Sequence, residues 1–262
     1  MLPFITIFGK QYGMYGIVAF IGIVIGILFA VFYFAKFYNV KKEDVFYASL
    51  FGVIGIGVGS KILYLITISP TLIKHASRIN WKETIPALIT GGFVFYGGLI
   101  GGILGLLVYA KVFKISFKTL IMIFVPVAPI IHAIARFGCL CSGCCYGKEY
   151  HGPGHIVFHN SLYNNNNIPL FPTQIVESIC NFIIFGIILF TYKRFKGTYK
   201  PVSLYCILYG IARFFLEFTR GDEERGIFLL STSQWISILL IIIGIALFIY
   251  SFRNKEMDES KV

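Results

Sequence analysis

Seven long stretches of the sequence are almost entirely apolar, and they restrict the fold more than any other feature. Each is roughly 20 residues long, the length at which an α-helix crosses a hydrocarbon layer of about 30 Å. Backbone groups in lipid must bond within their own segment, so we expect helices rather than strands. The sequence therefore predicts an all-α polytopic membrane helix bundle with seven helices, near residues 13–35, 45–68, 92–113, 119–140, 172–193, 201–219 and 233–252.

Composition agrees with this class, because 57% of the 262 residues are hydrophobic and only 13% are charged. The mean hydropathy is +0.79, and soluble domains are usually only about 45 to 50% apolar. We expect a single transmembrane domain over residues 1–262. No basic segment with a cleavage site precedes the first stretch, so we expect no removable signal peptide.

Lysine and arginine are distributed unequally between alternate loops. The loops on one predicted side carry thirteen of them, and the loops on the other side carry seven, including Arg78 and Arg225. Because basic loops are retained in the cytoplasm, we expect the N-terminus outside and the C-terminus in the cytoplasm. The formal net charge of +11 then reflects topology and contact with anionic lipid, and we expect no nucleic-acid partner.

Two segments outside the helices are expected to be exposed. One is an external loop near residues 141–171, and the other is a short charged cytoplasmic tail near residues 253–262. The loop has the length of a lid or docking element. A plain connector is the alternative.

Three cations fall inside apolar stretches, where an unpaired charge costs about 2.5 to 3.5 kcal/mol. In the predicted orientation Lys61, Arg136 and Arg213 all lie toward the external leaflet. One interpretation is that they extend to the outer headgroups. The other interpretation is a phosphate-binding cavity that opens to that leaflet, because arginine binds phosphate in a bidentate manner. Four further polar residues are expected at the same depth: Tyr15, Tyr96, Gln174 and Glu177.

Two motifs bear on such a cavity. RFFLEFTRGDEER, at 213–225, places Arg213, Glu217 and Arg220 at a spacing that stacks three charges on one helical face. The glutamate would orient the arginines, and a purely structural ion pair is the alternative. In YGGLIGG, at 96–102, Gly97 and Gly98 either permit close helix packing or present amides to an anion.

Four cysteines lie within the motif ARFGCLCSGCCYG at residues 135–147: Cys139, Cys141, Cys144 and Cys145. Their spacing does not match common zinc modules, and no metal is predicted. His132 lies one helical turn before Arg136, on the face that also carries Cys139, where it would suit a base for a thiolate. Packing without chemistry, a disulfide or thiol relay, a metal site and a catalytic thiol remain open.

Seven segments, in order and along nearly the whole chain, resemble those of the prolipoprotein diacylglyceryl transferase family, which also has seven helices and an external N-terminus. GMYG (13–16), GSKILY (59–64) and FYGGLIGG (95–102) resemble segments in its first three helices. ARFGCLCSGCCYG lies on the family signature. FPTQIVES (171–178), RFFLEFTRGD (213–222) and SQWIS (233–237) complete the order.

The resemblance implies a transferase reaction. A diacylglyceryl group would pass from phosphatidylglycerol, or a related phospholipid, to the cysteine thiol of a preprolipoprotein-like acceptor, with release of glycerol phosphate. It implies no cofactor and no metal. The implied location is the cytoplasmic membrane of a bacterium, with the active site toward the extracytoplasmic leaflet.

The resemblance also implies roles for individual residues. Arg136 and Arg213 would hold the phosphate, Glu217 would orient Arg213, and Arg220 would guard the outer opening or contact the acceptor. The remaining implied catalytic positions are His132 and Tyr96. The other implied substrate-binding positions are Tyr15, Lys61, Tyr64, Gly97, Gly98, Gly138, Gln174 and Glu177.

Several signature positions differ from the family pattern. The family's histidine before the glycine pair is Tyr96 here, and tyrosine, with a pKa of about 10, is a poorer base at neutral pH. The family's Asn, Asn and Glu are Cys139, Ser142 and Cys144. Two alternatives follow: a divergent paralogue that uses another acceptor or only binds lipid, and a membrane thiol oxidoreductase that uses the cysteines at 139–145.

Overall fold

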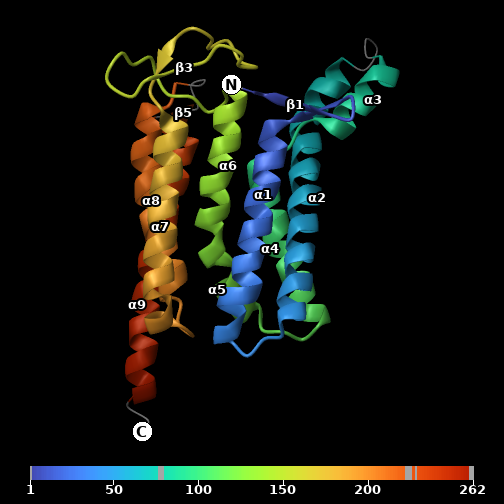
Figure 1. Ribbon diagram of the computed structural model, residues 1–262. Coiled ribbons are helices and arrows are strands. Elements are labelled where there is room, and N and C mark those ends of the chain that lie inside the picture. The colour runs from blue at the N-terminus through green and yellow to red at the C-terminus, as the bar shows by residue number, and fades with distance from the viewer. Residues whose placement is uncertain (1, 76–79, 222–225, 228, 260–262) are drawn as a thin grey trace. The chain divides into compact units, whose positions relative to one another are not determined.

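The computed structural model describes residues 2–75, 80–221, 226–227 and 229–259 (Figure 1). Arg78, Arg225 and the last residues of the expected tail, 260–262, lie outside the described residues. The helices are α1 (Met14–Phe29), η1 (Ala30–Phe34), η2 (Ala35–Phe37), α2 (Lys42–Lys74), α3 (Trp81–Thr90), α4 (Phe95–Val112), α5 (Phe117–Phe124), η4 (Val125–Val127), α6 (Ala128–Ser142), α7 (Thr173–Phe195), α8 (Lys200–Leu216), η5 (Glu217–Thr219) and α9 (Thr232–Glu259).

Contacts between residues divide the chain into two compact units. The first unit comprises Met1–Phe37 and Ile121–Val262, and the second comprises Tyr38–Leu120. The second unit is one continuous segment, whereas the first is assembled from two segments that lie on either side of it in the sequence. Each unit is described by itself below.

The predicted membrane-spanning helices are confirmed in number. Within the described ranges, seven helical segments are long and apolar enough to cross a membrane: Met14–Phe37, Lys42–Lys74, Phe95–Val112, Phe117–Ser142, Thr173–Phe195, Lys200–Thr219 and Thr232–Arg253. Large apolar side chains on them, such as Phe20, Ile54 and Phe190, expose 65%, 64% and 91% of their surface. Such exposure is expected of side chains that lipid solvates, and the chain is a multi-pass membrane protein.

Helix α2 extends six residues beyond its predicted end at residue 68 and passes through Pro70. A proline has no N–H to donate to the carbonyl four residues earlier, which here belongs to Ile66. The Ser69 hydroxyl donates to that carbonyl at 2.9 Å. This bond supplies a partner for the carbonyl, so the helix continues where hydropathy alone indicated a stop.

The structure contains short elements that the sequence did not predict. Helix α3 begins after Asn80, whose side-chain amide donates to Glu83 at 2.8 Å. At ten residues it is too short to cross a membrane. Among the described residues three antiparallel hairpins also occur, and they pair β1 (Phe4–Ile7) with β2 (Lys10–Gly13), β3 (Ile156–Val157) with β4 (Pro169–Leu170), and β5 (Gly226–Ile227) with β6 (Leu230–Ser231).

The second unit is held together by close backbone contact between α2 and α4. Gly59 of α2 and Gly97 of α4 face each other so closely that a Cβ on either would collide with the carbonyl of the other. The same holds for Gly55 and Gly101 one turn away. Without a hydrophobic driving force between helices in lipid, such close packing is a main source of helix association.

In the first unit, α6 packs against both α1 and α7. At the end of α7 far from the β3–β4 hairpin, the buried Tyr192 hydroxyl donates to the Met122 carbonyl at 2.8 Å. Near the middle, the buried Ser178 hydroxyl donates to the Ala133 carbonyl at 2.8 Å. These bonds fix the alignment of α7 relative to α5 and α6, and hence the level at which their polar side chains meet.

Candidate functional site

Arg136 lies inside the span formed by α6 and bonds to three side chains. Its Nη2 donates to Oε1 of Glu177 on α7 at 2.7 Å, and its Nε donates to Nε2 of His132 at 3.1 Å. Its Nη1 approaches the sulfur of Cys139 at 3.6 Å. The side chain of Arg136 is 13% exposed and that of Glu177 is 2% exposed. The buried carboxylate therefore supplies the counterion that an arginine in a membrane helix requires.

Arg213 forms a second ion pair at the end of α8. Its Nη2 lies 2.6 Å from Oε2 of Glu217 and donates to the Ser233 hydroxyl at 3.0 Å. This pair matches the predicted orientation of Arg213 by Glu217. Among the described residues, Nη1 of Arg213 is buried and has no hydrogen-bond partner. A buried charged donor without a partner is costly unless a ligand accepts from it.

The third arginine departs from the predicted helical face. Helix η5 ends at Thr219, and Arg220 has an extended backbone with ψ of 136°. Arg220 forms an isolated antiparallel bridge with Gly147, and Gly221 donates to the Tyr146 carbonyl at 3.0 Å. Arg220 is therefore placed by the strand-like contact with the segment after α6 rather than by a helix turn, and it is buried.

The three arginines act on one buried carboxylate. Arg136 pairs directly with Glu177, and both Arg213 and Arg220 interact with it electrostatically. These three arginines and the two glutamates carry one net positive charge when all are ionised. The ends of three spans, α6, α7 and α8, thus bring a cationic cluster together in the first unit, and its depth in the membrane stays a prediction.

The hydrogen bonds of His132 indicate how its ring is protonated. Its Nε2 accepts from Nε of Arg136, so that nitrogen carries a lone pair and the ring is neutral. Glu177 Oε1 lies 3.4 Å from the same nitrogen. The lone pair that a base would use is therefore engaged by Arg136, and the geometry favours positioning of the guanidinium by His132 over the predicted role as a base.

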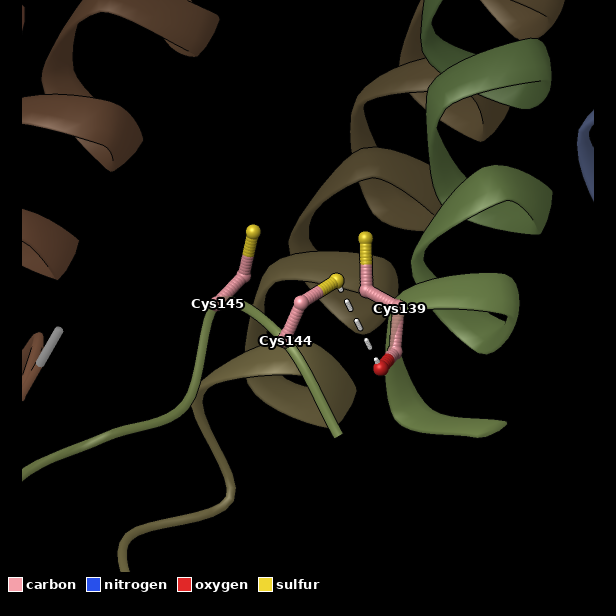
Figure 2. A group of neighbouring side chains, drawn as sticks. All are labelled: Cys139, Cys144 and Cys145. Carbon is pink, nitrogen blue, oxygen red and sulfur yellow. Dashed lines mark hydrogen bonds between the residues drawn. The ribbon is translucent and has the colours of Figure 1, made fainter. Parts of the chain in front are cut away.

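A tight turn at the end of α6 brings three of the four clustered cysteines together. Gly143 adopts a left-handed conformation with φ of 78°, and the amides of Gly143 and Cys144 both donate to the Cys139 carbonyl, at 2.9 and 3.2 Å. Cys145 is also left-handed, with φ of 58°, a conformation that costs a residue with a Cβ about 1 to 2 kcal/mol. The sulfurs of Cys139, Cys144 and Cys145 lie within 4.8 Å of one another. Figure 2 shows the three side chains gathered at this turn.

Two buried amides hold this turn. Gln174 of α7 donates to the Cys144 carbonyl at 2.8 Å, and Asn165 of the following loop donates to the Gly143 carbonyl at 2.8 Å. Each is only 1% exposed. The structure therefore places Gln174, which was predicted to bind the substrate, against the cysteine turn.

The two thiols beyond the end of α6 differ in acidity. Hydrogen bonds from Cys139 and Cys144 lower the pKa of the Cys145 thiol, and the charges of Arg220 and Arg136 act in the same direction. Hydrogen bonds with Cys139 and Cys145 raise the pKa of the Cys144 thiol. The positive charges of Arg220 and Arg136 therefore favour a thiolate at Cys145. All the cysteines are free thiols in the structure.

The loop between α6 and α7 is ordered by its own contacts. It contains the β3–β4 hairpin and lies at the same end of the first unit as the β5–β6 hairpin (Figure 1). The backbone N–H of Lys148 donates to the Thr219 carbonyl at 2.8 Å, and the Lys148 carbonyl accepts from the backbone N–H of Phe171 at 2.9 Å. The loop thus lies against the segment that follows α8, and both its predicted role as a lid or docking element and the alternative of a plain connector stay predictions.

Two predicted residues of α1 and α6 meet at the same level. Gly138 packs against the backbone of Tyr15, where an added Cβ would lie 3.1 Å from both Cα and the carbonyl oxygen. Tyr15 is half-exposed and interacts electrostatically with Cys139 and Arg136. Tyr15 therefore lies beside the arginine cluster, and Gly138 allows the close approach of α1.

The remaining predicted residues belong to the second unit. Lys61 donates to the Gly91 carbonyl, at the end of α3, at 2.5 Å, and its ammonium group lies over the rings of Phe93 and Tyr64. Gly97 and Gly98 are buried against α2, and Tyr96 is partly exposed beside Phe95. Packing explains the glycines, and the participation of these residues in substrate binding stays a prediction.

Sequence reasoning missed three residues that support the site. Ser233 bonds to Arg213, Asn165 bonds to Gly143, and Thr173 contacts Thr219 at 3.3 Å between hydroxyl oxygens. The asparagine run at 164–167 offered a signal, because four consecutive polar side chains beside a cysteine-rich turn suggest capping contacts. The serine and threonine contacts have no comparable sequence pattern.

Comparison with known proteins gives consistent matches over the whole length. Residues 3–250 match the family described as prolipoprotein diacylglyceryl transferase. A phosphatidylglycerol–prolipoprotein diacylglyceryl transferase of Clostridium perfringens is 37% identical over 243 residues, 92% of each chain. That of Clostridium tetani is 35% identical over 89% of this chain and 92% of its own, and that of Finegoldia magna is 30% identical over 97% of each.

Proposed function

The chain belongs to the prolipoprotein diacylglyceryl transferase family, and we propose that it moves the diacylglyceryl group of phosphatidylglycerol to the cysteine thiol of a prolipoprotein. The relatives are named as transferases, and their names include both substrates, phosphatidylglycerol and prolipoprotein. The residues of this chain supply the reasons why the cationic cluster suits that reaction.

The reaction needs a stabilised leaving group and a deprotonated nucleophile. The acceptor sulfur attacks a glycerol carbon of the diacylglyceryl group. The S–C bond forms as the bond between that carbon and the phosphate oxygen breaks, and the electron pair leaves on that oxygen as glycerol phosphate. The thiol proton must depart, because the thiolate is the nucleophile. Charge therefore builds on the phosphate in the transition state, where fixed cationic donors are most effective.

The single observation that carries the proposal is the buried, unpartnered Nη1 of Arg213 beside an arginine cluster with excess positive charge. A phosphate oxygen bound there would accept a charge-assisted hydrogen bond from a donor that has no partner among the described residues. Glu217 fixes the guanidinium in place, so little rearrangement accompanies the reaction. Arg136 would supply the second guanidinium, held by Glu177 and His132.

The predicted orientation places this cluster toward the extracytoplasmic leaflet. The excess of basic residues in the opposite loops supports that side, and the acceptor would approach the ordered loop between α6 and α7. Tyr15 and Gly138 would then form the edge at which the lipid enters between α1 and α6.

The proposal is tested by incubating the purified protein with phosphatidylglycerol and a prolipoprotein, and measuring lipidated acceptor and released glycerol phosphate together. We expect Arg136→Ala and Arg213→Ala each to abolish both products, whereas Arg194→Ala, at an exposed position near the end of α7, retains them. Unchanged lipidation in both site variants would reject the assignment. Lipid binding without either product would support the non-catalytic alternative.

A further inference from the structure

Three cysteine sulfurs converge at the end of α6, although the sequence spacing indicated no zinc module. We propose that Cys139, Cys144 and Cys145 bind one Zn²⁺ ion as thiolates, and that the fourth coordination position takes the thiol of the acceptor cysteine. The second half of this proposal rests on the proposed function, and the first half does not.

The distances suit a thiophilic ion. Zn–S bonds of about 2.3 Å at tetrahedral angles hold thiolates about 3.8 Å apart. The three sulfurs already lie within 4.8 Å of one another, so an ion would draw them together by about 1 Å at most. Cys144 would give up only a weak thiol hydrogen bond to the Cys139 carbonyl, which is 3.8 Å long (Figure 2).

The backbone at Cys145 adopts a left-handed conformation that is unfavourable for a residue with a Cβ. Successive side chains of an extended chain point to opposite sides, which makes adjacent cysteines difficult to place on one ion. The left-handed conformation of Cys145 breaks this alternation and turns its sulfur toward those of Cys139 and Cys144. Strained conformations of this kind are concentrated at functional sites. Gln174 and Asn165 hold the turn in place from outside.

The surrounding charge suits a thiolate site. Three thiolates with Zn²⁺ carry one net negative charge, and Arg136 already approaches the Cys139 sulfur with Nη1 at 3.6 Å. Arg220 and Arg136 both act electrostatically on Cys145. Donors around the ligands of a metal orient them and tune the ion, and the arginine cluster supplies such donors here.

The protein supplies three of the four ligands that zinc requires. Among the described residues, the cluster contains these three ligands only, and Cys141 does not belong to it. A zinc ion with three protein ligands and one free position has the form of a catalytic site. Cu⁺ would be satisfied by three thiolates and would leave no such position.

An open position on zinc supplies a step that the described side chains do not supply. Nε2 of His132 is engaged by Arg136, and Tyr96 is a weak base. A thiol that binds zinc loses its proton, which passes to solvent. The bound sulfur then forms a bond to the glycerol carbon as the bond between that carbon and the phosphate oxygen breaks. The electron pair leaves with glycerol phosphate. No oxidant or reductant is required.

The metal site is tested on the full chain in lipid nanodiscs, purified under reducing conditions. We expect about one zinc per chain by elemental analysis, and replacement by Co²⁺ should give the thiolate-to-cobalt charge-transfer band. Alkylation followed by mass spectrometry should show that zinc protects Cys139, Cys144 and Cys145 but not Cys141. This readout uses the unmodified chain and does not depend on the folding of a variant.

Variants provide a matched comparison. We expect Cys139→Ser, Cys144→Ser and Cys145→Ser each to lower the zinc content at least tenfold, while Cys141→Ser and Cys206→Ser retain it. A metal-free protein, bound Cu⁺ in place of zinc, or a disulfide between any two of the three sulfurs would overturn the proposal.

The fourth ligand is tested with a peptide that contains the acceptor cysteine. Added to the Co²⁺ protein, it should increase the charge-transfer intensity by about one third, as a fourth thiolate joins three, whereas the peptide with serine should not. If the metal-free chain lipidates its acceptor at the full rate, the zinc proposal fails and the proposed function stands. If zinc binds the three cysteines and no lipidation occurs, the proposed function fails, and with it the assignment of the fourth ligand.

Discussion

At the scale of single residues, Glu177 decides whether a charged arginine can remain inside α6. We expect Glu177→Gln to lower the free energy of unfolding by about 3 to 5 kcal/mol, because it leaves a buried guanidinium without its counterion. Denaturant unfolding in mixed micelles measures the change. Glu149→Gln is the control, since Glu149 pairs with His151 in an exposed position and should cost less than about 0.5 kcal/mol. Equal costs would contradict the role of burial.

Arg213 is expected to matter for its fork-shaped side chain as well as for its charge. Arg213→Lys retains a cation near Glu217 but removes the second nitrogen, Nη1, which has no partner in the described part of the chain. We expect kcat/KM for lipidation to fall roughly ten- to hundredfold, since a hydrogen bond to a charged group contributes about 1.5 to 3 kcal/mol. Arg194→Lys should leave it unchanged, and an equal rate in Arg213→Lys would exclude a bidentate contact.

The convergence of polar residues was predictable, and so was the pair of Arg213 with Glu217 on one helical face, but the pairing of Arg136 across helices was not. Helix direction and span order alone placed Arg136, Glu177 and Arg213 at one depth. That Arg136 pairs with Glu177 depends on how α6 and α7 are rotated, and the apolar spans leave this rotation undefined in the sequence. Cys144 and Cys145 approach Cys139 because of the backbone torsions in the turn. Hydrophobic periodicity does not predict these torsions.

At the scale of elements, two glycines of α2 that are two residues apart should behave differently. A Cβ at Gly59 would meet the Gly97 carbonyl of α4, whereas a Cβ at Gly57 would meet nothing within 4 Å. We expect Gly59→Ala to destabilise the protein by about 1 to 3 kcal/mol through overpacking. Gly57→Ala should be neutral or mildly stabilising, because alanine favours helix. Thermal unfolding in detergent compares them, and similar melting temperatures would argue against the close contact.

The loop between α6 and α7 should be loosened by the loss of one amide. Asn165→Ala leaves the buried Gly143 carbonyl without the Asn165 donor, at a cost of about 1 to 3 kcal/mol. We expect faster hydrogen exchange and proteolysis in the loop, while the neighbouring exposed position, Asn164→Ala, should change neither. Identical protection in the two variants would show that the bond does not hold the loop.

The existence of the spanning helices was readable from the sequence, whereas several of their ends were not. The apolar stretches predicted seven spans because lipid allows few other solutions. Helix α2 continued through Pro70 because a serine hydroxyl took over a freed carbonyl, and Arg220 left the expected helical face because the chain became extended after Thr219. Both outcomes depend on local hydrogen bonds, which hydropathy does not predict.

At the scale of the whole molecule, an odd number of spans, seven among the described residues, predicts that the two termini lie on opposite sides of the membrane. The excess of basic residues predicts that these loops face the cytoplasm, so we expect fusions after Lys114 and Val262 to be fluorescent with green fluorescent protein and inactive with alkaline phosphatase. A fusion after His151 should show the reverse. An active phosphatase at Val262 would invert the topology and place the arginine cluster on the cytoplasmic side.

The split of the first unit around the second has a consequence for biosynthesis. The partners α2 and α4 emerge from the ribosome close together and can join at once. Helix α1 pairs with α6, which is synthesised about a hundred residues later, a wait of roughly 5 to 20 seconds at ordinary elongation rates. During that interval Gly22 and Gly26, the positions of α1 that approach Ile131, lack their partner helix α6, so the first span to be synthesised is among the last to be packed.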